Sequence, residues 1–547
     1  MKKHGKKMIA PVIVTLVILA YFAGIIAAFT LIPGIPAVAK ALMIVGTMSN
    51  AGKSLVTAGL CRVFNQDGYK VAPFKSQNMA LNSFITAEGA EMGRAQVVQA
   101  EAANIEPSVL MNPILLKPTS DSGSQVIVNG EAIGTMKAGE YYAMKHTLRP
   151  EVQKAFDTLA SKFDIVCIEG AGSPAEINIK KDDFVNMGMA KMAKAPVLLV
   201  ADIDRGGVFA SIYGTLMLLE DDEREMVKGV IINKFRGDVE ILRPGLKMIE
   251  DKTGVPIVGV LPMLKVDIED EDSLSERISG RSEVKLIDIA VVRIPRMSNY
   301  TDFNVFELIP GVSLRYVTSV RELGQPDMII IPGTKNTTGD LKWLRQSGME
   351  AAILKHANSG TVVFGVCGGY QMLGKQISDP YGEEDGTGKA NVTPGMGLLD
   401  IETTFIEKKR TIQMAGKFGQ VQGIFSALSG LPLYGYEIHS GVTEFPEEKA
   451  LTSISPIHEN GEIMAEGSQN TEGKLNVYGT YVHGVFDGDG IAVKIVEALL
   501  AKKGKKMDDI QTINFAEYKR QQYDILADSI RENLDMKKIY EILEAGV

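Results

Sequence analysis

A glycine-rich loop that carries a lysine and a serine lies near the start of the chain, between a short apolar run and a helical stretch. It reads Gly46-Thr47-Met48-Ser49-Asn50-Ala51-Gly52-Lys53-Ser54, after LMIV and before LVTAGLCRVF. The backbone N–H groups of such loops bind phosphate oxygens, the lysine reaches the β- and γ-phosphates, and the serine hydroxyl binds Mg²⁺. The spacing, G-x5-GKS, is longer than the usual G-x4-GKS. The residues predicted to bind ATP and Mg²⁺ are Gly46, Asn50, Gly52, Lys53 and Ser54.

Polar side chains end several other apolar runs that we expect to be parallel strands. Glu169 ends DIVCIE, Asp202 and Asp204 end VLLVADID, and Asn233 ends GVIIN. Nucleotide sites in parallel sheets lie at the carboxyl ends of the strands, so these side chains are candidates for the same site. We predict that Glu169 binds Mg²⁺ and that the two aspartates contact substrate or metal, while a helix N-cap role stays open for each acid. Asn233 either reads an adenine edge or forms a turn.

A second candidate site surrounds Cys367, in the run Gly365-Val366-Cys367-Gly368-Gly369. The pattern G-x-C-x-G, after the apolar run TVVF and before a helix, is the thiol counterpart of the nucleophile elbow, a tight turn that exposes its side chain. The N-terminus of a helix also favours the thiolate. The backbone N–H groups of Gly333 and Gly368 are the predicted oxyanion donors. An inert buried thiol is the alternative, and we keep that interpretation for Cys61 and Cys167.

A thiol nucleophile requires a base, and the sequence has six histidines. His483, in Tyr481-Val482-His483-Gly484-Val485-Phe486, follows an apolar run late in the chain and is the first candidate. His439, in Tyr436-Glu437-Ile438-His439-Ser440-Gly441, is the second. We therefore predict a Cys367–His483 pair and keep His439 as the alternative base.

These residues need a scaffold that brings strand ends together. Short β-branched runs, apolar along their whole length, alternate with helical stretches in two series, which is typical of parallel strands covered on both faces. The first series covers residues 42–47, 164–170, 195–204, 227–235 and 256–262, and the second covers 286–295, 327–334, 361–369 and 474–484. The predicted fold class is α/β, with a doubly wound phosphate-loop domain followed by a second α/β domain.

The change between the two series suggests where the domains meet. An acidic, strand-poor stretch, VDIEDEDSLSERISGRS, separates them. The expected divisions are an N-terminal extension (1–40), a nucleotide-binding domain (41–265), a linker (266–285), a second domain (286–500) and a C-terminal helical cap (501–547).

The composition excludes several classes of protein. The 547 residues include 45% hydrophobic and 23% charged residues, which is ordinary globular usage. The formal net charge is −9, and this balance does not favour nucleic-acid binding. The three cysteines form neither a disulfide framework nor a CxxC metal motif.

The N-terminus differs from the rest of the chain. Residues 8–32 contain no charge and follow Lys2, Lys3, Lys6 and Lys7. We predict a transmembrane helix here, with a secretory signal peptide as the rival interpretation. The basic flank favours export of the following residues, but ATP and a reduced thiol are found in the cytosol. We therefore expect catalytic domains in the cytoplasm, anchored by one dispensable helix.

From about residue 41 to residue 500, the chain resembles the cobyric acid synthase family, the glutamine-hydrolysing amidotransferases of cobalamin biosynthesis. The longer phosphate loop is similar to that of dethiobiotin synthetase. The resemblance implies a dethiobiotin synthetase-like domain followed by a class I glutamine amidotransferase-like domain. The matching runs are GTMSNAGKS (46–54), APFKSQNMALNS (72–83), EMGRAQVVQAEAA (91–103), MNPILLKPTSDSGSQVI (111–127), IEGAGSPAEIN (168–178), NMGMAKMA (186–193), ADIDRGGVFASIYGT (201–215), NKFRGD (233–238), PRMSNYTDFN (295–304), PGTKNT (332–337), GVCGGYQMLG (365–374) and YVHGVF (481–486).

The resemblance implies a reaction and roles for particular residues. Such enzymes use ATP and glutamine to amidate four peripheral carboxylates of a corrinoid, adenosylcobyrinic acid a,c-diamide, and so form adenosylcobyric acid. An acyl phosphate would form at the ATP site, and ammonia would come from glutamine through a thioester on Cys367, with His483 moving the proton. Further polar positions that match, and that we expect to contact substrate or metal, are Lys75, Gln77, Asn78 and Asp183.

Two features depart from related proteins. Other amidotransferases of this class have a glutamate two residues after the histidine, and this glutamate orients the imidazole. The family that this chain resembles lacks it, and in this chain the position is Val485. The residue that orients His483 is therefore unassigned, with Glu437 as a guess. The family also does not normally carry a segment like residues 1–40.

Two other functions remain as alternatives at this stage. One is the related cobyrinic acid a,c-diamide synthase, against which the runs FKSQNMALNS and NMGMAKMA argue. The other is a phosphate-loop ATPase with a regulatory role and a non-catalytic amidotransferase-like module. The presence of both Cys367 and His483 argues against that alternative.

Overall fold

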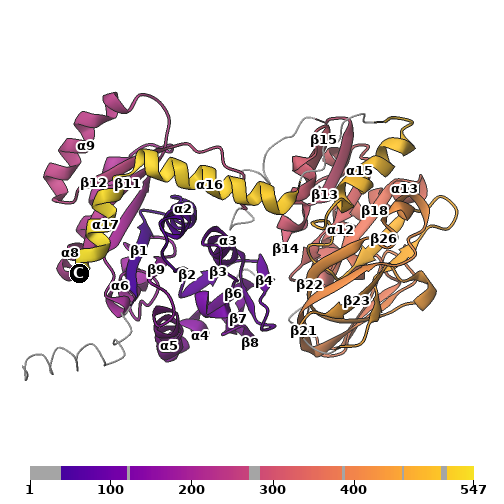
Figure 1. The fold of residues 1–547 in the computed structure, drawn as a ribbon. Coiled ribbons are helices and arrows are strands. Elements are labelled where there is room, and N and C mark those ends of the chain that lie inside the picture. Colours follow the sequence, from indigo (N-terminus) through magenta and orange to yellow (C-terminus); the bar gives the residue numbers. More distant parts are fainter. Residues whose placement is uncertain are drawn as a thin grey trace, which may run out of the picture.

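The computed structural model describes residues 39–547, apart from 120–122, 270–283, 383, 385–387, 459–460 and 507–513. The candidate membrane segment, 8–32, lies outside the described residues, as does most of the expected linker. Among the residues that are described, no helix combines the length and the apolar content needed to cross a membrane. Figure 1 shows two α/β bodies side by side, and their separate hydrophobic cores begin near residues 39 and 286.

The first body is built on a parallel sheet with the order β12-β11-β10-β1-β9-β2. Its strands are β1 (Lys40–Gly46), β2 (Val71–Phe74), β9 (Ile165–Glu169), β10 (Val197–Asp202), β11 (Val227–Phe235) and β12 (Ile257–Pro262). The β1 side chains from Leu42 to Val45 are fully buried, as expected for a central strand with helices on both faces. From β1 the chain first forms β2 and β9 on one side of this strand and then β10, β11 and β12 on the other side. A topological switch point therefore lies at the carboxyl end of β1. The predicted doubly wound sheet is confirmed.

Helices and two small sheets surround this central sheet (Figure 1). The helices are α2 (Lys53–Gln66), α3 (Arg94–Ala102), α4 (Ala138–Met144), α5 (Arg149–Ala160), α6 (Met187–Ala193), α7 (Val208–Leu218), α8 (Asp221–Met226) and α9 (Val239–Thr253). One small sheet has the order β3-β6-β7-β8 and the other pairs β4 with β5. Their strands are β3 (Gln77–Met79), β4 (Ser83–Ile85), β5 (Glu91–Gly93), β6 (Ile114–Pro118), β7 (Gly123–Val128) and β8 (Glu131–Lys137).

The second body contains a sheet with the order β15-β13-β16-β18-β26-β25, in which only β25 is antiparallel to its neighbour among the described strands. Its strands are β13 (Ile287–Val292), β15 (Val312–Val317), β16 (Met328–Ile331), β18 (Val362–Val366), β25 (Ser468–Asn470) and β26 (Val477–Thr480). The helical elements of this body are η4 (Tyr300–Leu308), α11 (Val320–Leu323), α12 (Thr337–Gln346), α13 (Met349–Asn358), α14 (Gly368–Met372), η5 (Gly423–Leu428), η6 (Glu447–Lys449) and α15 (Ile491–Lys502).

Two further sheets complete the second body. The pair β14 (Met297–Ser298) and β17 (Gly333–Thr334) is antiparallel. A larger sheet has the order β20-β19-β21-β23-β24, with β22 also paired to β21. Its strands are β19 (Gln376–Asp379), β20 (Asn391–Pro394), β21 (Glu402–Phe418), β22 (Pro432–Glu444), β23 (Thr452–Pro456) and β24 (Met464–Glu466). This sheet brings β22 against the residue His483, because Tyr436 and His483 form a β-bridge.

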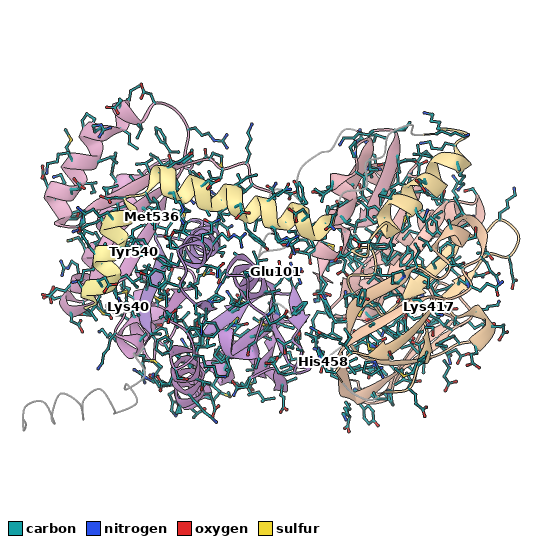
Figure 2. All side chains as sticks on the ribbon, viewed as in Figure 1. Lys40, Glu101, Lys417, His458, Met536 and Tyr540 are labelled. Atoms are coloured by element: carbon teal, nitrogen blue, oxygen red, sulfur yellow. The ribbon has the colours of Figure 1, made fainter. Side chains whose placement is uncertain are left out.

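The last two helices return to the first body after the second is complete. These are α16 (Phe515–Asn533) and α17 (Met536–Ala545). Buried residues on α16 recur with helical spacing at Tyr523, Leu526, Ala527 and Ile530, and they join the core that contains α2. Figure 1 shows α16 in yellow lying across the first body, and Figure 2 places Met536 and Tyr540 of α17 there as well.

Buried polar contacts join the two bodies. The Ser83 N–H donates to Asn299 Oδ1 at 3.1 Å, and the Tyr436 hydroxyl donates to the Ser83 carbonyl at 3.0 Å. Glu91 of the first body accepts from Lys117 at 2.7 Å and from Lys409 of the second body at 2.6 Å. The carboxylate is buried, but these two ammonium groups lower its pKa well below the usual range. Phe84 and Ile85 of the first body also pack against Tyr436 and Ile438 of the second, so the interface combines buried polar and apolar contacts.

Candidate active sites

The phosphate loop joins β1 to α2, and its backbone requires glycine at one position. Gly52 has φ +99°, and a Cβ there would lie 2.0 Å from Asn233 Nδ2, so a larger residue would be strained and would clash. Asn233 is 1% exposed and donates from Nδ2 to the Ala51 carbonyl at 2.9 Å. Asn233 thus fixes the loop from β11, which lies two strands away from β1 in the sheet. That it reads an adenine edge stays a prediction.

Lys53 and Glu169 are the charged groups beside this loop. Lys53 Nζ lies 3.2 Å from the Met48 carbonyl and 3.1 Å from the Gly172 carbonyl, so its ammonium group lies over the loop. Glu169 is fully buried at the end of β9 and accepts from Ser54 Oγ at 2.8 Å and from Lys75 Nζ at 3.0 Å. The predicted residues Lys53, Ser54, Lys75 and Glu169 are thus close together in the structure.

The donor set at Ser54 and Glu169 fits Mg²⁺. The ion prefers hard oxygen ligands and usually takes one or two from the protein, with waters and nucleotide phosphates completing the octahedron. A serine hydroxyl and a carboxylate 2.8 Å apart supply two such oxygens beside the phosphate loop. Across the described ranges no group of three or more His, Cys, Asp or Glu side chains could hold a metal alone. The chemistry of these two donors therefore suits a nucleotide-bound Mg²⁺ better than a resident metal.

The two aspartates after β10 differ in their surroundings. Asp202 is 2% exposed, and its Oδ2 accepts from Lys234 Nζ at 2.9 Å; the same ammonium donates to the Asn50 carbonyl at 2.7 Å. Lys234 therefore links Asp202 to the phosphate loop. Asp204 instead forms an exposed ion pair with Arg236 at 2.8 Å.

Three other predicted residues have structural contacts. Asp183 accepts from the backbone N–H groups of Val185 at 2.8 Å and Gly188 at 2.8 Å, and so holds the start of α6. Gln77 accepts from the Tyr141 hydroxyl, and buried Asn78 donates to Gln96 Oε1 at 3.3 Å. These contacts do not test whether the residues also meet a substrate.

The thiol lies at a sharp turn between β18 and α14. Cys367 has φ 52° and ψ −109°, a conformation that costs a non-glycine residue roughly 1–3 kcal/mol and that is found mainly at functional sites. A Cβ on Gly369 would lie 1.9 Å from the Ile331 carbonyl, so the turn packs directly on strand β16. Cys367 is 7% exposed, and its Sγ lies 3.8 Å from the Ile438 carbonyl.

His483 and the predicted oxyanion residues surround this thiol. A Cβ built on Gly333 would lie 3.2 Å from His483 Cε1 and 3.6 Å from Cys367 Cβ. A Cβ built on Gly368 would lie 3.2 Å from the backbone nitrogen of Thr334, the residue after Gly333. The segments that carry Gly333 and Gly368 therefore pack against each other. The structure therefore brings Cys367, His483, Gly333 and Gly368 into one small volume.

The imidazole of His483 also contacts an acid that the sequence analysis missed. Its Nδ1 lies 2.7 Å from Asp302 Oδ2, with both side chains buried. Burial alone lowers the pKa of His483, but the charge and hydrogen bond of Asp302, with a smaller contribution from Cys367, raise it to about 10. The contact with Asp302 thus favours the protonated form of His483. Asp302 lies within the run PRMSNYTDFN, 181 positions before the histidine, so spacing alone gives no signal for the contact.

The other candidate base, His439, has different neighbours. It stacks on Tyr481 with ring centroids 3.6 Å apart, and its Nδ1 lies 2.7 Å from the Gly441 carbonyl. Its Nε2 lies 3.7 Å from Glu437, which also pairs with Arg410. Glu437, the guessed orienting residue, therefore belongs to the His439 group in this structure, whereas Asp302 contacts His483. In the first body, sequence reasoning missed Gln99, whose Nε2 donates to Glu169 at 2.5 Å.

Comparisons with known proteins cover both bodies. Residues 42–274 match the CobQ/CobB/MinD/ParA nucleotide binding domain, and residues 288–491 match the CobB/CobQ-like glutamine amidotransferase domain. Both parts of the predicted fold class are confirmed. Among solved structures, PurLQS from Thermotoga maritima aligns with 40% of this chain and 99% of its own at 17% identity, with a TM-score of 0.29, which is too low to support an argument.

Curated proteins named cobyric acid synthase are similar over nearly the whole chain. The protein from Ruminiclostridium cellulolyticum is 58% identical over 93% of this chain and 98% of its own length. The protein from Lachnoclostridium phytofermentans is 57% identical over 93% and 100%, and that from Yersinia enterocolitica is 50% identical over 92% and 98%. The resemblance inferred from the sequence is confirmed.

Proposed function

Since this chain belongs to the cobyric acid synthase family, we propose that it uses ATP and glutamine to convert adenosylcobyrinic acid a,c-diamide to adenosylcobyric acid. As a member of this family, the chain is an ATP-dependent, glutamine-hydrolysing amide ligase of cobalamin biosynthesis. The corrinoid substrate and the amidation of four peripheral carboxylates are the parts that we propose for this chain.

One observation carries the proposal: a single chain holds a strained Cys367 beside His483 and, in its other body, Lys53, Ser54 and Glu169 around a phosphate loop. The first set of residues suits the release of ammonia from an amide. The second suits activation of an acid by a nucleoside triphosphate. A protein that only bound a partner would need neither a strained thiol nor an imidazolium beside it.

Glutamine hydrolysis would proceed through a thioester. The Cys367 thiolate attacks the side-chain amide carbon of glutamine, and the backbone N–H groups at Gly333 and Gly368 stabilise the oxyanion. The C–N bond then breaks, and the leaving nitrogen takes a proton from the His483 imidazolium to depart as ammonia. His483, now neutral, accepts a proton from water as that water attacks the thioester. The C–S bond then breaks, which releases glutamate and restores the Cys367 thiolate and the His483 imidazolium.

Amidation would take place in the first body. A corrinoid carboxylate attacks the γ-phosphorus of ATP, the bond to ADP breaks, and an acyl phosphate forms. Lys53 stabilises the negative charge on the phosphate oxygens throughout this transfer. Ammonia then attacks the acyl carbon, and phosphate leaves. The residues in or beside the loop that would bind the nucleotide are Gly46, Asn50, Gly52, Lys53, Ser54 and Asn233.

Ser54 and Glu169 would hold Mg²⁺ together with the nucleotide. When bound, the ion would neutralise charge on the transferred phosphoryl group. In the structure Lys75 donates to the same carboxylate oxygen as Ser54, so we propose that Lys75 adjusts its contact when the metal binds. Asp202, close to the loop through Lys234, is the better supported of the two aspartates for a role in this site; Gln77, Asn78 and Asp183 remain weaker candidates.

The reaction is tested by mass spectrometry of the corrinoid after incubation with ATP, Mg²⁺ and glutamine. We expect carboxyl-to-amide conversions on adenosylcobyrinic acid a,c-diamide, ending at four. Amidation only of cobyrinic acid, at the a and c positions, would instead identify an a,c-diamide synthase. Hydrolysis of ATP without amidation of either corrinoid would contradict both assignments.

We also propose that residues 8–32 form a membrane anchor and that the catalytic bodies lie in the cytoplasm. The support is the length of the uncharged run and the cytosolic supply of ATP, glutamine and reduced thiols. A chain that begins at Ala41 should remain in the soluble fraction with unchanged kinetics, whereas the full chain should sediment with membranes. External protease that cut the catalytic bodies in intact cells would contradict this topology.

A further inference from the structure

Asp302 uses both carboxylate oxygens on the loop that carries His483. Oδ2 lies 2.7 Å from His483 Nδ1, and Oδ1 accepts from the Gly484 N–H at 3.2 Å. The side chains of Asp302 and His483 are 5% and 1% exposed, so water competes little for either group. The acid therefore fixes the imidazole ring and the backbone just after it.

This contact determines which ring nitrogen can serve the thiol. Because Nδ1 is taken by Asp302, the interaction of His483 with Cys367 must use Nε2. A carboxylate on Nδ1 selects the reactive tautomer of a neutral histidine and stabilises the imidazolium, as an acid does for the histidine of serine proteases. The same geometry here would favour the thiolate–imidazolium pair.

Packing holds the two segments in register. Asp302 lies in η4, whose Phe303 and Phe306 have ring centroids 6.3 Å and 5.0 Å from Phe486. All three rings are fully buried, and Phe486 follows His483 by three residues. The aromatic contacts between η4 and the histidine loop thus fix the distance between the acid and the base.

Other acids nearby do not replace Asp302. Glu437 pairs with Arg410 and His439, and Glu466 accepts from Thr452, Thr480 and the Tyr481 N–H. Burial and the charge of nearby Asp302 raise the pKa of Asp487 to about 8, which favours its neutral form. The charges of Arg94, Glu269 and Lys519 also act on Asp487.

We propose that Asp302 is the positioning residue of a Cys367–His483–Asp302 triad, and that it reaches the histidine from the start of the second body, by way of η4. It takes the place of the glutamate that other amidotransferases of this class carry two residues after the histidine, where this chain has Val485. The proposal rests on the glutaminase function proposed above, because a positioning residue has meaning only if Cys367 and His483 react.

The test is Asp302→Asn, which preserves size and removes the charge. Glutaminase kcat should fall about 10²- to 10⁴-fold, by analogy with the same change in a serine protease triad, while KM for glutamine changes by less than about threefold. The rate of Cys367 alkylation by iodoacetamide at pH 7 should fall, and its pH profile should shift upward, because the imidazolium loses its counter-charge. Amidation with free ammonia should stay within about twofold, since the ATP site is untouched.

Asp487→Asn is the matched control. This acid is buried in the same cluster, and its raised pKa favours the neutral acid, which the amide imitates. Glutaminase should therefore stay within about threefold of the native rate. If Asp302→Asn keeps its glutaminase rate and alkylation profile, the proposal is wrong. If the native chain itself hydrolyses no glutamine, the proposed function fails first, and the two failures are thereby distinguished.

A spectroscopic measurement covers the case in which Asp302→Asn does not fold. A proton shared between imidazolium Nδ1 and a buried carboxylate should give a one-proton NMR resonance far downfield of the amide region in the native chain. The resonance should vanish in His483→Ala and persist in His439→Ala. If the native chain shows no such resonance between about pH 6 and pH 9, the proposal is overturned whatever the variants do.

Discussion

The phosphate-loop site and the thiol site both lie at carboxyl ends of parallel strands, yet they are assembled differently. Gly46 to Ser54 form most of the first site within one continuous segment, and Glu169 of β9 and Asn233 of β11 join it from other strands of the same sheet. The second site draws Cys367 from the turn after β18, His483 from the segment after β26, and Asp302 from η4. A locally encoded site is visible in a motif, whereas a dispersed one depends on the topology that brings its parts together.

This difference extends to the kind of interaction that matters. The phosphate loop works mainly through backbone N–H groups and one lysine, so its chemistry depends on loop conformation. The thiol site works through a chain of proton-sharing side chains, so its chemistry depends on the relative positions of three segments. Substitutions in the thiol site should therefore reduce amidation only when glutamine is the nitrogen source. Substitutions in the phosphate-loop site should reduce amidation with either glutamine or ammonia.

After removal of the thiol itself, the largest effect is expected for His483→Ala. Glutaminase kcat should fall roughly 10²- to 10⁴-fold, because the variant lacks both the acid for the leaving nitrogen and the base for thioester hydrolysis. Synthesis with free ammonia should remain. His439→Ala is the matched control and should keep most of its glutaminase activity, because His439 stacks on Tyr481 away from the Asp302 contact. Loss of activity in the control alone would show that the wrong histidine was assigned.

A somewhat smaller but broader effect is expected for Lys53→Ala. Amidation should fall about 10²- to 10³-fold with either glutamine or ammonia, because the contact to the phosphates stabilises acid activation whatever the nitrogen source. The glutaminase should retain a basal rate, which serves as the internal control for folding. Near-normal amidation by this variant would refute the phosphate-loop assignment.

Glu169→Gln should have an intermediate effect confined to the first body. We expect amidation to fall roughly 10- to 100-fold, and the Mg²⁺ concentration that gives half the maximal rate to rise, because the amide is a weaker ligand than the carboxylate. Steady-state kinetics over a Mg²⁺ titration would measure both. An unchanged Mg²⁺ dependence would mean that the ion is held elsewhere.

The smallest effect concerns stability and pH. The folded-state pKa of His483, raised to about 10, lies above its ordinary value, so the Asp302 pair contributes stability that is fully present below about pH 6.5 and is lost as the pH rises toward 10. Relative to His483→Gln, the native chain should lose on the order of 1 kcal/mol or more across this interval, measured by urea unfolding. Parallel pH profiles for the two chains would contradict the assigned charge state.

The sequence was sufficient for the parallel strands and for the motifs at their ends. The fully apolar runs predicted β1, β9, β10, β13 and β18. A strand that is covered by helices on both faces of the sheet carries apolar side chains along nearly its whole length. The phosphate loop and the turn at Cys367 could be predicted because each is formed by a few consecutive residues with a recognisable pattern. Asp302 was not, because the contact joins segments far apart in sequence, and one aspartate in an irregular segment carries no periodic or spacing signal.

The return of the C-terminal helices illustrates the same limit. The helical pattern after residue 500 could be read from the sequence, but its partner could not. Gly59 of α2 lies against Ile530 of α16, where a Cβ would approach to 2.7 Å. The α16 side chain Tyr523 donates to Glu101, labelled in Figure 2, at 2.7 Å. Such contacts depend on shape complementarity between helices that amphipathic spacing alone does not specify.

The central claim is that one chain divides the reaction between two separate sites, and Cys367→Ala with two nitrogen sources tests it most directly. Corrinoid amidation should be measured by mass spectrometry, with glutamine or with ammonium as the only nitrogen donor. The account predicts that amidation from glutamine is lost, while amidation from ammonium keeps the native rate within about twofold, since the thiolate acts only in releasing ammonia. Loss of both activities in a folded variant, or survival of the glutamine reaction, would contradict it.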